Sequence, residues 1–158
     1  IAKIHPVFRK YRKQGVFVAH CPESNTNLSS GVAPVKDYLK KGLKVGLGSD
    51  IAAGSSLSIF KAMAMAVQCS KLRWRLFDQS VEPLTVDEVF YLATKGGGEF
   101  FGKVGSFEEG YEFDAVVIED ATIRHPQELN VKERLERVIY LAEDKNIVAK
   151  FVNGKKIL

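Results

Sequence analysis

The residue best suited to chemistry by type and position is Asp50. It ends the segment from Val45 to Asp50, in which an apolar run passes through two glycines and presents a carboxylate. In α/β barrels the C-terminal ends of the strands form the active-site face. A carboxylate there can bind a metal ion as a hard oxygen ligand, or accept a proton from activated water. From spacing alone, the alternative is that Asp50 caps the following helix.

His20 and Cys21 are the next candidates, because they directly follow the apolar run from Val16 to Ala19. They could form a pair of metal ligands, or a nucleophile with its base. Adjacent residues of an extended chain point to opposite faces, so a hydrogen-bonded loop histidine and an unreactive buried thiol are the alternative. The polar side chains that follow could contact a ligand or bond their own backbone in turns; they include Ser24, Asn25 and Asn27.

Other chemical patterns are weaker. His5 and His125 each precede a proline and have no partner at metal-ligand spacing, so we expect both at the surface. A dinucleotide-binding fingerprint would need a third glycine at position 51, which is Ile51. Trp74 lies among basic residues, which suits an amphipathic surface or a dimer contact.

Composition favours an ordinary globular protein. The chain has 158 residues, 46% of them hydrophobic, and a formal net charge of +4, so it can build a core and needs no nucleic-acid partner. At the start of the chain, the basic residues Lys3, Arg9, Lys10, Arg12 and Lys13 precede the first acidic residue, Glu23, but no aromatic stacking platform accompanies them. The two cysteines form no C-x-x-C pair, which fits a reducing, cytoplasmic compartment. No apolar stretch is long enough for a membrane span.

The elements that would position Asp50 follow the order of a parallel α/β sheet. We expect strands at 16–19 and 43–47, a loop at 23–31, a helix at 35–41 and a longer helix around 57–67. A capping box at Thr85 to Glu88 starts another helix, which should end at the glycine run 96–98.

After residue 102 the pattern changes. Short apolar runs at 115–118 and 147–152 predict strands, and Asn153-Gly154 predicts a hairpin turn. We therefore expect a parallel α/β part at 1–102 and a small, mainly β part at 103–158.

Several segments together resemble deaminases of the amidohydrolase superfamily: 18–25, 28–31, 46–50, 93–98, 105–110 and 113–118. Segments 106–107, 112–115 and 138–147 look most like the guanine deaminase branch. The resemblance implies that residues 1–102 are the C-terminal part of a (β/α)8 metal-dependent hydrolase barrel, with its last two strands and helices. Residues 103–158 would be part of a small β-sandwich.

The resemblance also implies the chemistry. Such enzymes hold one divalent metal, zinc or iron, and Asp50 matches the aspartate that both binds the metal and accepts a proton from the attacking water. His20 and Asn25 match positions that shape the substrate pocket, the substrate being a small purine. A cytoplasmic homodimer is the expected form of the parent enzyme.

The chain lacks other parts of that site. It contains no H-x-H, and no residues match the two further histidine ligands or the acid/base glutamate. One carboxylate cannot hold a catalytic metal, since such sites use three protein ligands. Because the chain also starts without Met, inside a predicted helix, we expect a fragment that is inactive alone.

Two alternatives stay open. The first is a related amidohydrolase that acts on an adenosine derivative or a chlorinated triazine. The second, of a different class, is a non-catalytic α/β module that binds a partner through its basic N-terminal residues.

Overall fold

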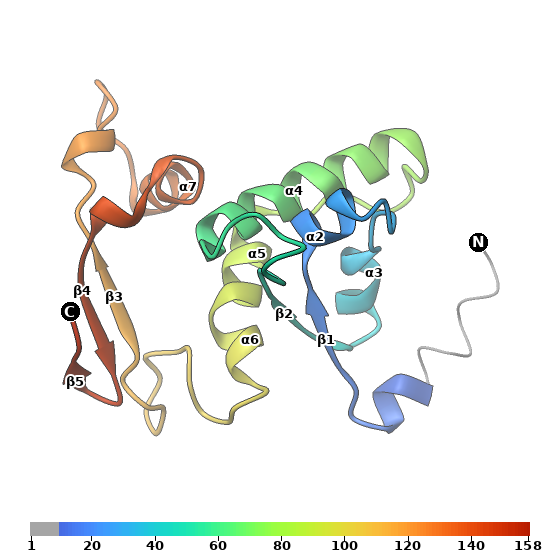
Figure 1. Cartoon of the computed structure of the whole chain (residues 1–158), viewed down its shortest axis with the longest axis horizontal. Coiled ribbons are helices and arrows are strands. Elements are labelled where there is room, and N and C mark those ends of the chain that lie inside the picture. Colours follow the sequence, from blue (N-terminus) through green and yellow to red (C-terminus); the bar gives the residue numbers. More distant parts are fainter. Residues whose placement is uncertain (1–9) are drawn as a thin grey trace.

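The computed structural model describes residues 10–158 and has an α/β fold with two separate sheets (Figure 1). In the first sheet, β1 (Phe17–His20) pairs in parallel with β2 (Lys44–Leu47), so that His20 lies opposite Leu47. In the second, β3 (Ala115–Ile118), β4 (Ile147–Val152) and β5 (Lys155–Lys156) are antiparallel. The predicted strands and the hairpin at Asn153-Gly154 are thus confirmed.

Helices connect and cover these strands. They are α2 (Pro22–Asn27), α3 (Val35–Lys40), α4 (Ile59–Leu76), α5 (Val86–Ala93), α6 (Lys95–Gly98) and α7 (Val131–Leu141), with 3-10 turns η2 (Ala121–Ile123) and η3 (Asp144–Asn146). Parallel strands need a crossover connection, and here α2 and α3 lie between β1 and β2 in the chain. The long α4 packs against α2, α5 and α7 and runs along the top of the view, above β1 and β2 (Figure 1).

The core lies where β2 meets its helices. Val45 of β2, Met63 of α4, Val89 and Leu92 of α5 and Ile139 of α7 are at most 2% exposed and form one cluster. Each buried aliphatic side chain of this size stabilises the fold by about 1.5–3 kcal/mol. This core fixes the strand that leads to Asp50.

Two local predictions were wrong. The expected loop at 23–31 begins as α2, because Pro22 suits a first helical turn and Glu23 complements the helix dipole. The glycine run 96–98 does not end a helix but forms α6. Its glycines allow close packing, since a Cβ on Gly46 of β2 would lie 2.9 Å from the Cα of Gly97.

The C-terminal part contains more helix than expected. The 11 residues of α7 follow a capping box in which Asn130 accepts from the Glu133 amide and the Glu133 carboxylate accepts from the Asn130 amide. The pattern Asn-x-x-Glu could have indicated this helix from sequence. Because α7 packs on α4, the division at residue 102 stays a prediction.

At the N-terminal end, residues 10–13 are helical and Gly15 has a φ of 66°, a left-handed value that suits the end of a helix. Lys3, His5 and Arg9 lie outside the described residues. The side chains of Lys10, Arg12 and Lys13 are exposed.

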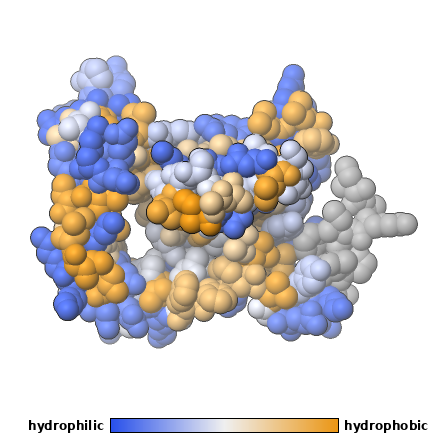
Figure 2. All heavy atoms as spheres, in the orientation of Figure 1, coloured by the Kyte–Doolittle hydropathy of each residue, from blue (hydrophilic) through white to orange (hydrophobic). Residues whose placement is uncertain are grey.

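Large apolar side chains are exposed over the C-terminal sheet, at the left of Figure 2. Val116, Val117, Val148 and Val152 are each 45–52% exposed. Apolar surface of this kind is typical of regions that contact other protein. Within residues 10–158, none of the helices has the length and apolar character that crossing a membrane requires.

Candidate functional site

Asp50 is presented by a tight loop directly after β2. The Gly48 amide donates to the His20 carbonyl (3.0 Å) and so extends the pairing of the two strands by one residue. Asp50 then takes a φ of 48°, and its carbonyl accepts from the Gly54 amide at 2.7 Å. A Cβ on Gly54 would lie 2.0 Å from the Ser49 carbonyl oxygen, so only glycine fits this turn. The Asp50 side chain is exposed at the strand end.

The Asp50 carboxylate is bound by a residue of α2, the helix that follows β1. The hydroxyl of Ser24, in α2, donates to Oδ2 of Asp50 at 2.6 Å. Ser24 is only 2% exposed. The next helix, α4, starts at Ile59 after Ser58, so Asp50 caps no helix. The capping alternative for Asp50 was therefore wrong.

Two further side chains of α2 bind the same loop. Glu23 accepts hydrogen bonds from the Ser55 amide, at 3.1 Å, and from the Ser55 hydroxyl. The Asn27 side chain donates to the Ala53 carbonyl at 2.8 Å. The segment that carries Asp50 is thus attached to α2 at three positions.

His20 is the last residue of β1 and is 4% exposed. Its Nδ1 is buried and has no hydrogen-bond partner among residues 10–158, so the expectation of a hydrogen-bonded loop histidine was wrong. Burial lowers the pKa of His20 from 6.5 to about 4. At neutral pH the imidazole is therefore uncharged.

Cys21 and Asn25 have less specific environments. Burial and the nearby negative charge of Asp50 raise the pKa of the Cys21 thiol, which keeps it protonated. Since the thiolate is the nucleophile, this disfavours a Cys21–His20 catalytic pair. Asn25 is half-buried on α2, and its side chain makes no hydrogen bond within the described part of the chain. Its place in a substrate pocket stays a prediction.

Comparison with known proteins decides the family. The model of the Amidohydrolase family matches residues 3–157. The chain belongs to the amidohydrolase family.

Among amidohydrolases, this chain is 36% identical to guanine deaminase of Homo sapiens, over 94% of the chain and 35% of that protein. A structure of guanine deaminase from C. acetobutylicum, with guanine bound in its active site, matches with a TM-score of 0.92 and 47% identity. This match covers the whole of the present chain and 38% of the chain in that structure. An adenosine deaminase from Xanthomonas campestris with bound zinc matches with a TM-score of 0.81 and 25% identity, over 98% of the chain and 34% of that structure. The chain thus spans about a third of the length of the relatives it matches.

The described residues of this amidohydrolase fit one ligand of a metal site and no more. Within residues 10–158, no cluster of three or more His, Cys, Asp or Glu side chains could hold a metal ion. Asp50 offers a carboxylate oxygen at an exposed strand end, whereas catalytic zinc sites use three protein ligands. Any further ligands must come from outside these residues.

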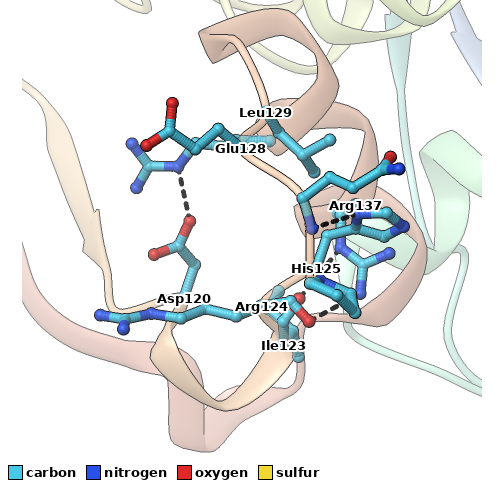
Figure 3. A pocket seen from close by; sticks show the side chains of 10 residues that line it. Asp120, Ile123, Arg124, His125, Glu128, Leu129 and Arg137 are labelled. Atoms are coloured by element: carbon cyan, nitrogen blue, oxygen red, sulfur yellow. Dashed lines mark hydrogen bonds and ion pairs between the residues drawn. The ribbon is translucent and has the colours of Figure 1, made fainter.

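A cavity of about 380 Å³ lies elsewhere, between η2, the following loop and α7 (Figure 3). Its arginines serve the fold: Arg134 donates to Asp120 at 2.8 Å, and Arg137 donates to the carbonyl of Ile123 at 3.0 Å. The hydrogen bond from Arg134 lowers the pKa of Asp120. His125 is exposed, as predicted, and its Nδ1 accepts from the Gln127 amide. Asp120 of this cavity is paired with Arg134, and Nδ1 of His125 already accepts a hydrogen bond, so we assign the candidate site to the ends of β1 and β2.

The structure therefore places His20 at the end of β1, Asn25 in the helix that follows it and Asp50 after β2, as the order of elements suggested. Sequence reasoning missed Ser24 as the partner of Asp50, since it considered only ligand contacts or turn roles for the polar residues there. The spacing Glu-Ser-x-x-Asn after a proline could have indicated a helix with several polar side chains on one side.

Proposed function

We propose that the complete protein hydrolyses guanine to xanthine and ammonia. The observation that carries this proposal is the likeness to the guanine-bound deaminase structure, at 47% identity over the whole chain. Likeness to the adenosine deaminase is lower, at 25% identity, so an adenosine derivative is the second candidate substrate.

In the proposed reaction Asp50 is the proton acceptor. A divalent metal, zinc in this proposal, would lower the pKa of a water molecule that it binds. Asp50 would be one ligand of that metal through its carboxylate. The carboxylate accepts a proton from the attacking water, whose oxygen bonds to C2 of guanine. The proton then passes to the amino group as the C2–N bond breaks and ammonia leaves, with no change of oxidation state.

His20 and Asn25 have pocket roles in this proposal. Because burial keeps His20 uncharged, its ring can exchange hydrogen bonds with a neutral purine without bringing a positive charge near the metal. Asn25 can both donate and accept hydrogen bonds, as the edge of a purine requires.

The proposed architecture follows from the same likeness. The strands β1 and β2 would be the last two strands of a (β/α)8 barrel, with residues 103–158 as part of a β-sandwich. The exposed valines of the C-terminal sheet would then pack against the remainder of the longer protein. We further propose a cytoplasmic homodimer that binds a small purine, with Trp74 as a candidate dimer contact.

The test uses the full-length protein, with Asp50→Ala as the variant. We expect about one metal per subunit in the parent, ammonia release from guanine, and a loss of kcat of ~10³-fold or more in the variant. Asp87→Ala is a matched control, because Asp87 is an exposed carboxylate that pairs with Lys132 on another face. Activity that survives in Asp50→Ala would contradict the assignment, and release of ammonia from adenosine alone would favour the second substrate.

A further inference from the structure

We propose that Ser24 is a positioning residue, which fixes the orientation of the Asp50 carboxylate for the reaction. Helix α2 would also hold residues 48–58, which connect β2 to α4 and are called the Asp50 loop below, in a fixed position relative to β1. This inference rests on the proposed deaminase function for its catalytic part, and on the Ser24–Asp50 geometry for its structural part.

Asp50 needs an external partner to hold one orientation. Its side chain is exposed and lies on a loop, so packing does not restrict it. The terminal torsion of an aspartate is broad, which lets the two carboxylate oxygens exchange places. Within residues 10–158, the hydrogen bond from Ser24 is the side-chain bond that selects one orientation.

Ser24 is well placed to impose that orientation. It is 2% exposed, and its carbonyl accepts from the Leu28 amide at 2.9 Å, so its backbone is part of a hydrogen-bonded turn. A buried hydroxyl is costly without a partner, and the partner here is Oδ2 of Asp50. A donor fixed in this way, bonded to a charged acceptor, is both strong and directional.

The hydrogen bond from Ser24 gives the two carboxylate oxygens of Asp50 different roles. Oδ2 is occupied by the Ser24 hydroxyl, and Oδ1 has no hydrogen-bond partner in the described part of the chain. Oδ1 is therefore the atom left to bind the metal or to accept the proton. Without Ser24, either oxygen could turn toward the reacting atoms, and the productive geometry would be populated less often.

The other bonds of α2 extend this constraint to the backbone. Glu23 and Asn27 are four residues apart on the helix, so they share a face, and they bind Ser55 and Ala53 of the Asp50 loop. Ser24 thus orients the carboxylate, while Glu23 and Asn27 hold the loop that carries it.

The experiment measures kcat and KM for guanine in the full-length, metal-loaded protein and its variants. Ser24→Ala should lower kcat by ~10–100-fold, the usual effect of losing the group that orients a metal ligand, with KM changed by less than ~3-fold. Ser24→Thr keeps the hydroxyl and should recover most of the lost kcat. On an Asp50→Asn background, Ser24→Ala should add no further loss, because both changes affect the same interaction.

Thr26→Ala is the matched control, since Thr26 lies on the same helix and its hydroxyl donates to the Pro22 carbonyl instead of Asp50. It should leave kcat unchanged. A Ser24→Ala protein with kcat within ~2-fold of the parent overturns the proposal. It is also overturned if Ser24→Ala lowers kcat by the same factor on the Asp50→Asn background as it does in the parent.

A crystal structure of the metal-free protein supplies a readout independent of activity. In the parent, the Asp50 carboxylate should have one conformer bonded to Ser24, and in Ser24→Ala it should rotate or split. If the parent deaminates neither guanine nor adenosine, the proposed function fails, and the conformer of Asp50 still decides whether Ser24 positions it. An unchanged, single conformer in Ser24→Ala would refute the positioning role.

Discussion

The hydroxyl of Ser24 donates a hydrogen bond to Oδ2 of Asp50, and so joins the helix after β1 to the residue after β2. The two residues are 26 positions apart in the chain. They meet because β1 and β2 are parallel and end at the same edge of the sheet. The partner of the candidate catalytic carboxylate is therefore supplied by strand pairing, and the core around Val45 keeps that pairing in place.

The bond from Asn27 to Ala53 should matter for activity. Asn27→Asp replaces the amide donor by a carboxylate oxygen, which cannot donate and repels the Ala53 carbonyl. We expect the Asp50 loop to shift, kcat for guanine to fall by ~3–10-fold, and the free energy of unfolding to fall by about 1 kcal/mol. Ammonia release and thermal unfolding of the full-length protein measure the two effects.

Asn27→Ala is the comparison for that change. It removes the same bond without adding a negative charge, so its loss should lie between those of the parent and Asn27→Asp. Equal activity in all three proteins would show that the Asn27 contact does not hold the loop.

Acid should destabilise the protein through His20. Its pKa is about 4 in the folded protein and 6.5 in the unfolded chain, so the unfolded state binds more protons between these values. Stability contributed by the neutral imidazole is complete above pH 6.5 and is lost as the pH falls toward 4. Between pH 7 and pH 5 this amounts to about 2 kcal/mol.

Thermal unfolding of the parent and of His20→Gln at several pH values measures that contribution. Glutamine is uncharged throughout this range, so the variant should lose less stability on acidification than the parent. Two curves of equal slope between pH 7 and pH 5 would mean that His20 titrates normally in the folded protein.

Much of the frame could be predicted from the sequence, because it depends on local patterns. The apolar runs before His20 and before Gly48 form the paired strands β1 and β2, and the Thr85 to Glu88 capping box starts α5. Asp50 was identifiable because a carboxylate after such a strand faces the open end of the sheet.

The parts that could not be predicted depend on contacts between distant segments. The residues of α2 could have indicated a helix, but nothing in the sequence shows that Glu23 and Asn27 bind Ser55 and Ala53, which lie 32 and 26 residues further on. The buried state of His20 also depends on the elements around β1, which its neighbours in the chain do not reveal.

The ion pair between Lys36 and Glu88 should contribute to stability. Lys36, at the start of α3, donates to both carboxylate oxygens of Glu88 at 2.6 and 2.7 Å. Burial raises the pKa of Glu88, but hydrogen bonds from Lys36 and Thr85 outweigh this effect and lower it. Glu88→Gln should reduce the free energy of unfolding by about 1–3 kcal/mol at pH 7, because it leaves the half-buried ammonium unpaired.

The sign of the pH dependence gives a second check of that pair. A depressed carboxyl pKa contributes stability above its unfolded value of about 4.5, and this is lost as the pH falls below that value. The difference between parent and Glu88→Gln should therefore shrink in acid. Glu82→Gln is the control, since Glu82 is exposed and forms no ion pair in the described residues, and it should match the parent.

The close contact between Gly48 and Cys21 makes a prediction about the strand end that carries Asp50. A Cβ at position 48 would lie 2.9 Å from the Cys21 sulfur, so Gly48→Ala should force a shift there. We expect Gly48→Ala to lower the free energy of unfolding by about 1–3 kcal/mol and to lower kcat, because Asp50 lies two residues further on.

Cys21→Ala removes the sulfur, and in the double variant the new methyl group at position 48 should occupy the space that the sulfur leaves. Both stability and kcat should then recover beyond the sum of the single changes, as thermal unfolding and ammonia release would measure. Strictly additive losses would mean that Gly48 is needed for its backbone and not for the room it gives Cys21.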